Sequence, residues 1–282
     1  MRDATGESYQ ERINRVMVYI QQRLEEPLPL DELAAVAAFS PYHFHRIFTG
    51  MVGESVKEHL RRLRLERAAG RLRDTADPVT DIAFAAGYRT HESFTRAFRA
   101  MFGGAPSEFR ESRREVLARA MARPAGEPLA VRVKRMGPAR LAFIRHVGPY
   151  DEVGKAWAKL YPWAGRNGLL GPGAETLGVV HDDPEITPPE RLRYDAAIVV
   201  PERIQPAGEI GIQELAPGDY ATAMHRGPYH ALGATYARLC GEWLPSSGRE
   251  AGSAPAFEIY RNMPHTTPPD ELVTEIYVPL AD

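Results

Sequence analysis

The sequence predicts a two-domain protein, with an all-α N-terminal domain followed by an α+β domain that contains an antiparallel sheet. The length of 282 residues is sufficient for two domains of ordinary size. Only 5 of the 24 prolines precede residue 124, which favours helices before that point and strands and turns after it. The formal net charge of -2 also divides there, into +3 for residues 1–123 and -5 for the remainder.

The N-terminal domain, residues 8–121, is predicted to be helical throughout. Apolar residues at helical spacing, from Ile13 to Leu24, indicate an amphipathic opening helix that ends before Pro27. The same reasoning predicts further helices at residues 31–38, 41–49, 55–73, 79–86, 91–101 and 107–121.

A short linker is predicted at residues 122–128, where Pro124 and Pro128 disfavour a continuous helix. The second domain, residues 129–282, contains short alternating or β-branched runs separated by glycine and proline. Strands are predicted around 131–133, 139–145, 177–179, 196–200, 219–225, 256–261 and 273–277. Helical stretches are predicted at 150–166 and 228–243.

The N-terminal domain contains an internal repeat, because the pattern of residues 33–48 returns in residues 82–98. Each copy reads as a small helix, a tight turn and a second amphipathic helix, which is the helix-turn-helix motif. Ser40 and Thr90 are suited to cap the second helices, and Gly87 can supply a turn that needs positive φ. The sequence therefore predicts two helix-turn-helix motifs.

The outward faces of the two second helices carry donors, acceptors and rings suited to base edges and phosphates. Two helical hairpins with ordinary solvated faces are the alternative, which the repetition of the pattern disfavours. The predicted DNA-reading residues are Tyr42, His43, His45 and Arg46 in the first copy, and His91, Glu92, Ser93, Thr95 and Arg96 in the second.

The connecting helix at 55–73 is rich in arginine, and residues 40–73 carry a net charge of +5. We expect Arg61 and Arg62 on this helix to neutralise phosphates and release counterions. A helix of 19 residues spans about 28 Å at 1.5 Å per residue. A monomer could therefore place its two reading helices in successive major grooves, which are about 34 Å apart.

Residues 12–114 resemble the DNA-binding domain of AraC/XylS-type transcription regulators. The resemblance rests on LDELAAVAAFSPYHFHRIF and on VTDIAFAAGYRTHESFTRAFRAMFGGAPSEFR. It implies that Tyr42, His45 and Arg46 face one major groove of double-stranded DNA and that the second set faces the next, with RNA polymerase as a further partner. His45 stands where relatives often carry Gln or Ser, so the bases read do not carry over.

The second domain also contains a repeat, because the Gly-Pro-Tyr turn ending at Tyr150 is echoed by the turn ending at Tyr229. Each copy follows a strand and opens a helix, which predicts two βαββ pseudo-repeats. Residues 129–281 resemble the GyrI-like effector-binding domain, chiefly in FEIYRNMPHTTPPDELVTEIYVPL. That resemblance implies a sheet-lined groove for amphipathic, often cationic or aromatic, small molecules.

Glu258 matches the pocket glutamate of that family, so we expect it to bind the effector. Side chains alternate along a strand, so Glu258 and Tyr260 share one face and Phe257 and Ile259 the other. A carboxylate among aromatic rings can bind an organic cation by charge and cation–π attraction. The other predicted ligand-binding residues are Tyr150, Trp163, Tyr229, Tyr260 and Glu275.

Several classes of protein are disfavoured. The single Cys240 gives no disulfide framework or thiolate zinc site, and the absence of long apolar runs and of a signal-peptide profile predicts a cytoplasmic protein. No HExxH, GxSxG or P-loop motif occurs, so we expect no metal, no cofactor and no enzymatic activity.

Two alternatives stay open: a GyrI-like hydrolase of reactive small molecules fused to a DNA-binding domain, and an architectural DNA-binding protein whose second domain only dimerises.

Overall fold

A computed structural model of the protein describes residues 8–112 and 129–281. The chain divides into two compact units, of which these two ranges form the main parts. The predicted linker at 122–128 lies outside the described residues, as does the predicted helix 107–121 beyond residue 112. None of the helices in the described ranges is long and apolar enough to span a membrane.

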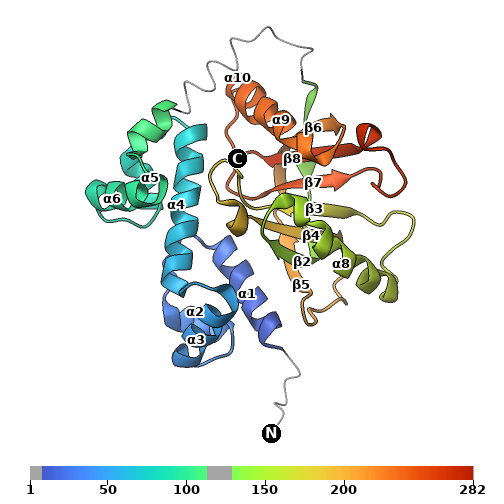
Figure 1. The fold of residues 1–282 in the computed structure, drawn as a ribbon, viewed down its shortest axis with the longest axis horizontal. Coiled ribbons are helices and arrows are strands. Elements are labelled where there is room, and N and C mark those ends of the chain that lie inside the picture. The colour runs from blue at the N-terminus through green and yellow to red at the C-terminus, as the bar shows by residue number, and fades with distance from the viewer. Residues whose placement is uncertain (1–7, 113–128, 282) are drawn as a thin grey trace. The chain divides into compact units, whose positions relative to one another are not determined.

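The N-terminal unit is built from helices close to the predicted positions (Figure 1). Residues 106–112 are also helical. The bounds of the labelled helices are α1 (Tyr9–Gln22), α2 (Leu30–Val36), α3 (Pro41–Val52), α4 (Val56–Asp74), α5 (Val79–Ala85) and α6 (His91–Phe102).

The long helix α4 joins two small helical pairs, α2 with α3 and α5 with α6. Each pair closes over two phenylalanines that are fully buried. The ring centroids of Phe44 and Phe48 on α3 are 5.6 Å apart, and those of Phe94 and Phe98 on α6 are 5.5 Å apart. The same buried rings at the same spacing confirm that the sequence repeat is a structural repeat.

The ends of α3 and α6 also match. The side chains of Ser40 and Thr90 accept hydrogen bonds from the backbone N–H three residues on, at 3.4 and 3.2 Å, as their predicted capping role requires. Both helices end at glycines in the left-handed region, Gly53 with φ 81° and Gly103 with φ 82°. Local sequence signals therefore set the length of both helices.

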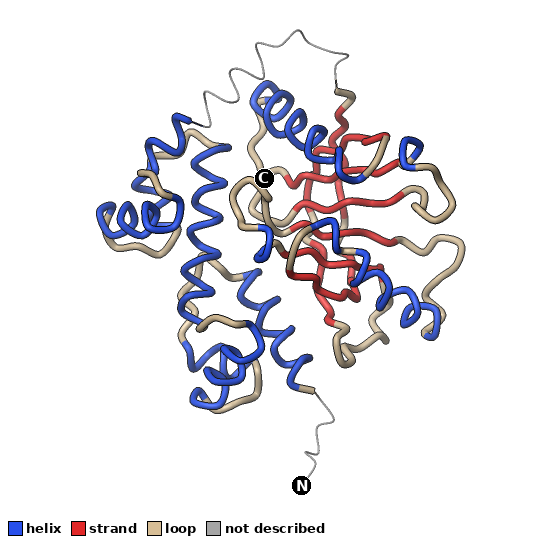
Figure 2. The backbone as a smooth tube through the Cα atoms, viewed as in Figure 1, coloured by secondary structure: helices blue, strands red, loops and turns tan. Residues whose placement is uncertain are grey.

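The C-terminal unit contains a sheet in the order β1-β6-β8-β7-β3-β4-β2-β5, with helices on one face (Figure 2). The strands are β1 (Val131–Met136), β2 (Ala139–Val147), β3 (Thr176–Val180), β4 (Arg193–Val199), β5 (Gly211–Leu215), β6 (Gly218–Arg226), β7 (Ala256–Tyr260) and β8 (Val273–Pro279). The helices are α8 (Gly154–Arg166), α9 (Leu232–Arg238) and α10 (Leu244–Ser247), with a π-helical turn at Leu239–Trp243 between the last two.

The two predicted βαββ pseudo-repeats are present as β2-α8-β3-β4 and β6-α9-β7-β8, and β3 pairs with β7 where the repeats meet. β1 precedes the first repeat and lies beside β6, the first strand of the second repeat. β5 precedes the second repeat and lies beside β2, the first strand of the first repeat. The sequence reasoning found β1 but missed β5. This exchange of leading strands joins the two repeats into one sheet.

Candidate functional site

The predicted DNA-reading side chains lie mainly on the solvent side of α3 and α6. Tyr42, His43, His45 and Arg46 are exposed, as are His91, Glu92 and Arg96. The Arg46 guanidinium donates a 2.7 Å hydrogen bond to the Tyr42 hydroxyl and lies 5.6 Å from the centre of its ring. Helix α3 therefore presents a cation held against an aromatic ring.

Ser93 and Thr95 are less available than the other predicted reading residues. The Ser93 hydroxyl donates to the backbone carbonyl of Thr90 at 2.9 Å. The Thr95 hydroxyl oxygen is buried and has no hydrogen-bond partner within the part of the chain that the structure describes. A contact between either hydroxyl and a base would require its side chain to change rotamer.

The two predicted phosphate contacts on α4 differ sharply. Arg61 is exposed. Arg62 is only 15% exposed, because its guanidinium lies between Glu54 at 2.7 Å and Glu66 at 3.0 Å. Burial by itself raises the pKa of the Glu54 carboxyl, but hydrogen bonds with His59 and Arg62 outweigh it and lower this pKa to about 2. The geometry therefore does not support the predicted phosphate contact of Arg62.

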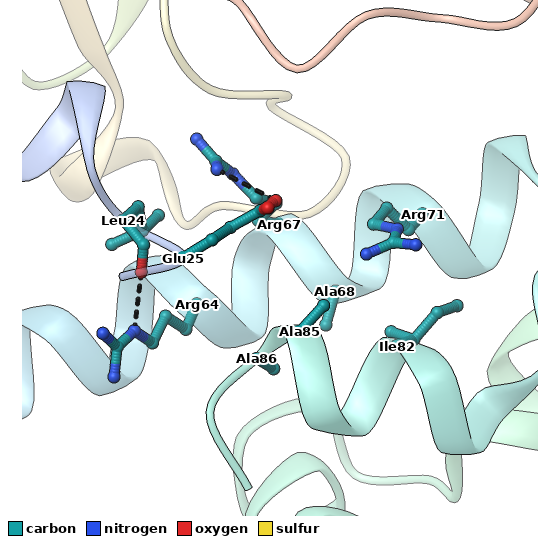
Figure 3. Close-up of a pocket in the computed structure, with 9 residues that line it drawn as sticks. All are labelled: Leu24, Glu25, Arg64, Arg67, Ala68, Arg71, Ile82, Ala85 and Ala86. Atoms are coloured by element: carbon teal, nitrogen blue, oxygen red, sulfur yellow. Dashed lines mark hydrogen bonds and ion pairs between the residues drawn. The ribbon is translucent and has the colours of Figure 1, made fainter. Parts of the chain in front are cut away.

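Other arginines on α4 hold the N-terminal unit together. Figure 3 shows a shallow pocket between α4 and α5, where the Arg64 guanidinium donates to the carbonyl of Leu24 at 2.8 Å. Arg67 forms an ion pair with Glu25 at 3.4 Å in the same view. Both contacts join α4 to the chain that follows α1. Much of the positive charge predicted for DNA thus has partners inside the protein.

In the C-terminal unit, Glu258 of β7 is 5% exposed and lies on the face covered by α8 and α9. Its carboxylate accepts hydrogen bonds from two phenol hydroxyls, Tyr260 at 2.7 Å and Tyr236 of α9 at 3.1 Å. Burial raises the pKa of Glu258, and the two hydrogen bonds oppose this rise only in part. A cation that entered this site would stabilise the charged form of the carboxyl.

Aromatic side chains from several elements surround Glu258. Rings of Trp157 and Tyr229 meet Tyr260 edge to face at 5.8 and 5.5 Å, and Trp157 stacks on Tyr161 at 5.2 Å. Tyr150 packs on Tyr194 at 6.2 Å. We call this group the aromatic cluster, which consists of Tyr150, Trp157, Tyr161, Tyr194, Tyr229, Tyr236 and Tyr260.

The cluster includes three of the predicted ligand-binding tyrosines. Tyr150 donates to the carbonyl of Asp182 at 2.6 Å, and burial raises its pKa. Tyr229 is 36% exposed, and burial of its other side raises its pKa to about 12. Tyr260 contacts Glu258 directly. These three residues and Glu258 are brought together as the sequence predicted.

Glu275 lies elsewhere. Ile276 of β8 is the residue paired with Glu258, so the neighbouring Glu275 points to the opposite face of the sheet. There it is ion-paired with Lys134 and Arg261, and Tyr277 donates to it at 3.0 Å. Burial opposes its charge, but these contacts lower its pKa below the usual value. Glu275 therefore already has cationic partners and is not part of the aromatic cluster.

Trp163 is also outside the cluster. It lies on α8, and no ring contact joins it to the aromatic residues around Glu258 in the described structure. Sequence reasoning, by contrast, missed Tyr194 and Tyr236. No sequence signal marks Tyr194, because its position beside Gly178 depends on the pairing of β3 with β4. A Cβ on that glycine would lie 2.2 Å from the Tyr194 hydroxyl.

The chain matches two family models. One describes a GyrI-like small molecule binding domain and matches residues 129–281, more than half of the chain. The other describes a helix-turn-helix domain and matches residues 33–112. The second match begins within α2 and covers the rest of both helical pairs described above, and the first covers all of the C-terminal strands and helices.

Individual proteins match parts of the chain. The right origin-binding protein of Escherichia coli K12 is 35% identical over 100 residues, which cover 36% of this chain and 35% of that protein. Regulatory protein SoxS of Salmonella typhimurium is 33% identical over 103 residues, 36% of this chain and 96% of SoxS. A crystal structure of the EcmrR C-terminal domain is 20% identical with a TM-score of 0.45, and the match covers 55% of this chain and 98% of that domain.

The two family matches agree with the architecture on which the site is built. Residues 33–112 carry α3 and α6 with their exposed side chains, and residues 129–281 carry the buried carboxylate and its aromatic cluster. The protein belongs to the GyrI-like small molecule binding domain family and joins this domain to an AraC-type helix-turn-helix domain.

Proposed function

We propose that this protein is a transcription regulator that binds asymmetric DNA sites through its two helix-turn-helix motifs and responds to a small amphipathic cation. The observation that carries the DNA-binding part is the equivalence of Arg46 and Arg96. Both are exposed, and both lie two residues after the first buried phenylalanine of their helices. The right origin-binding protein and SoxS, named for DNA origin binding and for regulation, support this assignment.

The effector part of the proposal rests on Glu258. It is a carboxylate in an aromatic cluster, and within the described residues its hydrogen bonds come from the phenol hydroxyls of Tyr236 and Tyr260. Such a site favours an organic cation over a neutral molecule of the same shape, by charge and by cation–π attraction of about 1 to 2 kcal/mol for each well-placed ring. Binding of the effector would change the affinity of the protein for DNA or its contact with RNA polymerase. We expect the protein to act in the cytoplasm.

The test of the effector site compares benzyltrimethylammonium with its uncharged isostere neopentylbenzene, by isothermal titration of the full chain. We expect the cation to bind the natural protein more tightly than the isostere does. Glu258→Gln should weaken the cation at least tenfold and leave the isostere unchanged, because only the charge is lost. Equal affinity of the cation for both proteins would remove Glu258 from the proposal.

The DNA-binding part is tested with duplex sites selected by the full chain from a random library. Enrichment of a defined sequence supports the regulator, and absence of any enrichment contradicts it. The hydrolase alternative is tested with a hydrolysable cation, the ester benzoylcholine, incubated with the full chain and analysed by mass spectrometry. Recovery of the intact ester supports a sensor, whereas release of benzoate and choline above the rate without protein would show turnover.

A further inference from the structure

A chain of hydrogen bonds runs from α8 to Glu258. The indole Nε1 of Trp157 donates to the hydroxyl of Tyr194 at 3.1 Å. The Tyr194 hydroxyl lies 2.7 Å from that of Tyr260, which in turn donates to Glu258 Oε2 at 2.7 Å. Three side chains, one each from α8, β4 and β7, are thereby linked to one carboxylate oxygen of Glu258.

The chemistry of the groups fixes the direction of this chain. An indole N–H can only donate, so the Tyr194 oxygen is the acceptor of the Trp157 bond. The single hydroxyl hydrogen of Tyr260 is used on the charged carboxylate, so its oxygen must accept from Tyr194. Every donor therefore points toward Glu258, and bonds aligned in this way strengthen one another.

One position in the sheet lacks a side chain, and this allows the chain of hydrogen bonds to form. Gly178 of β3 pairs with Glu258 across β3 and β7 and also with Ala196 of β4. A Cβ at Gly178 would lie 2.2 Å from the Tyr194 hydroxyl oxygen. The Tyr194 side chain therefore crosses β3 over a position without a side chain, and reaches Tyr260 on the far strand.

In the described residues, the titratable groups nearest Glu258 are phenols, with the Asp182–Arg193 ion pair next to Tyr150 and the Cys240 thiol next to Tyr236. Tyr260 faces it from β7, Tyr194 from β4 and Tyr236 from α9, and Tyr150 and Tyr229 precede α8 and α9. Burial raises the pKa of these tyrosines, so they are neutral at physiological pH. Hydrogen bonds from phenols thus support the charged form of Glu258, and a bound cation would support it further.

We propose that Trp157 and Tyr194 are positioning residues for cation recognition, because they orient Tyr260 as a donor and so hold Glu258 as a carboxylate. This inference rests on the proposed role of Glu258 as the cation-binding group. It assigns the recognition of charge to residues of both pseudo-repeats, since Trp157 and Tyr194 belong to the first and Tyr260 and Glu258 to the second. Neither Trp157 nor Tyr194 need contact the effector for this role.

The first experiment needs no effector. The full chain is labelled at the glutamate side-chain carboxyl carbons, and the Glu258 signal is identified by its loss in Glu258→Gln. We expect Tyr194→Phe and Trp157→Phe each to raise the titration midpoint of this signal by about half a pH unit. Trp163→Phe is the control outside the hydrogen-bond chain and the aromatic cluster, and it should leave the midpoint unchanged. Unchanged midpoints in both test variants, or an equal shift in the control, would overturn the inference.

The second experiment measures the affinity of benzyltrimethylammonium against pH. Tyr194→Phe should weaken binding about threefold below the shifted midpoint, since a half-unit shift changes the charged fraction by that factor, and should bind normally at higher pH. Recovery at higher pH separates a shifted carboxyl from general damage to the site, and weakening by the same factor at every pH would contradict the inference. If Glu258→Gln binds normally while the carbon-detected shifts are present, the proposed function fails and the positioning role stands.

Discussion

Ala38 and Gly87 occupy the same position in the two helix-turn-helix turns, and both have positive φ, 52° and 81°. For an L-residue with a Cβ the left-handed region is unfavourable by about 1 kcal/mol. The first turn therefore contains strain that the second avoids. We expect Ala38→Gly to raise the free energy of unfolding by about 1 kcal/mol, measured by urea denaturation of the full chain.

The reverse substitution at Gly87 provides the control. Gly87→Ala should lower the free energy of unfolding by more than 1 kcal/mol, because a new Cβ would also lie 3.1 Å from an Arg64 guanidinium nitrogen. Equal stabilities for Ala38→Gly and the natural protein would show that the first turn is not strained.

The helical half could be predicted in detail because its signals are local. Ser40 and Thr90 mark the starts of α3 and α6, and Gly53 and Gly103 mark their ends. Each of these residues lies directly beside the helix end that it determines. The ion pair between Arg62 and Glu54 could not be predicted in this way, because it does not join neighbours in the sequence. Arg62 lies eight residues from Glu54 along the chain, and only the packing of α4 shows that their side chains meet.

Substitution of the reading arginines should weaken DNA binding. Arg46→Ala and Arg96→Ala should each weaken binding to a selected site by about 1 to 3 kcal/mol if the arginine reads a guanine. Fluorescence anisotropy with labelled duplex measures this loss. Arg135→Ala, in the C-terminal unit and 75% exposed, is the matched control and should bind normally. No loss at either Arg46 or Arg96 would rule out α3 and α6 as the reading helices.

Arg61 and Arg62 should behave differently although they are neighbours. Arg61 is exposed and available to a phosphate, so Arg61→Ala should reduce the slope of log affinity against log salt by about 0.9. Arg62→Ala should leave that slope unchanged and lower stability instead, because Glu54 and Glu66 lose their shared cation. Salt titrations of DNA binding distinguish the two outcomes. A reduced slope for Arg62→Ala would restore the phosphate contact that the ion pairs argue against.

The Glu54 carboxyl should make stability depend on acid pH. Its pKa of about 2 in the folded protein is below the ordinary value of 4.5, so it stabilises the fold above about pH 4.5. That contribution, about 3 kcal/mol at 1.4 kcal/mol per unit, is lost as pH falls from 4.5 to 2. The free energy of unfolding, measured by urea denaturation across this range, should therefore fall more steeply with decreasing pH for the natural protein than for Glu54→Gln. Identical pH profiles would mean that the ion pairs do not lower this pKa.

The effector site was only partly predictable. Alternation along one strand placed Glu258 and Tyr260 together, since neighbours two apart share a face. It could not relate β7 to β8, because the register that sends Glu275 to the other face depends on pairing between strands. Tyr194 was missed for the same reason, since its role depends on a glycine in the adjacent strand.

The last prediction concerns that glycine. Gly178→Ala should lower the free energy of unfolding by about 1 to 3 kcal/mol, because the new Cβ overlaps the Tyr194 ring and forces it away from Trp157 and Tyr260. Gly154→Ala, where nothing lies within 4 Å of the added carbon, should change stability by less than about 0.5 kcal/mol. Tyr194→Leu shortens the overlapping side chain, so Gly178→Ala should be better tolerated in that background. An equal loss in both backgrounds, measured by urea denaturation as a double-mutant cycle, would place the overlap elsewhere and remove Gly178 from the account of the hydrogen-bond chain.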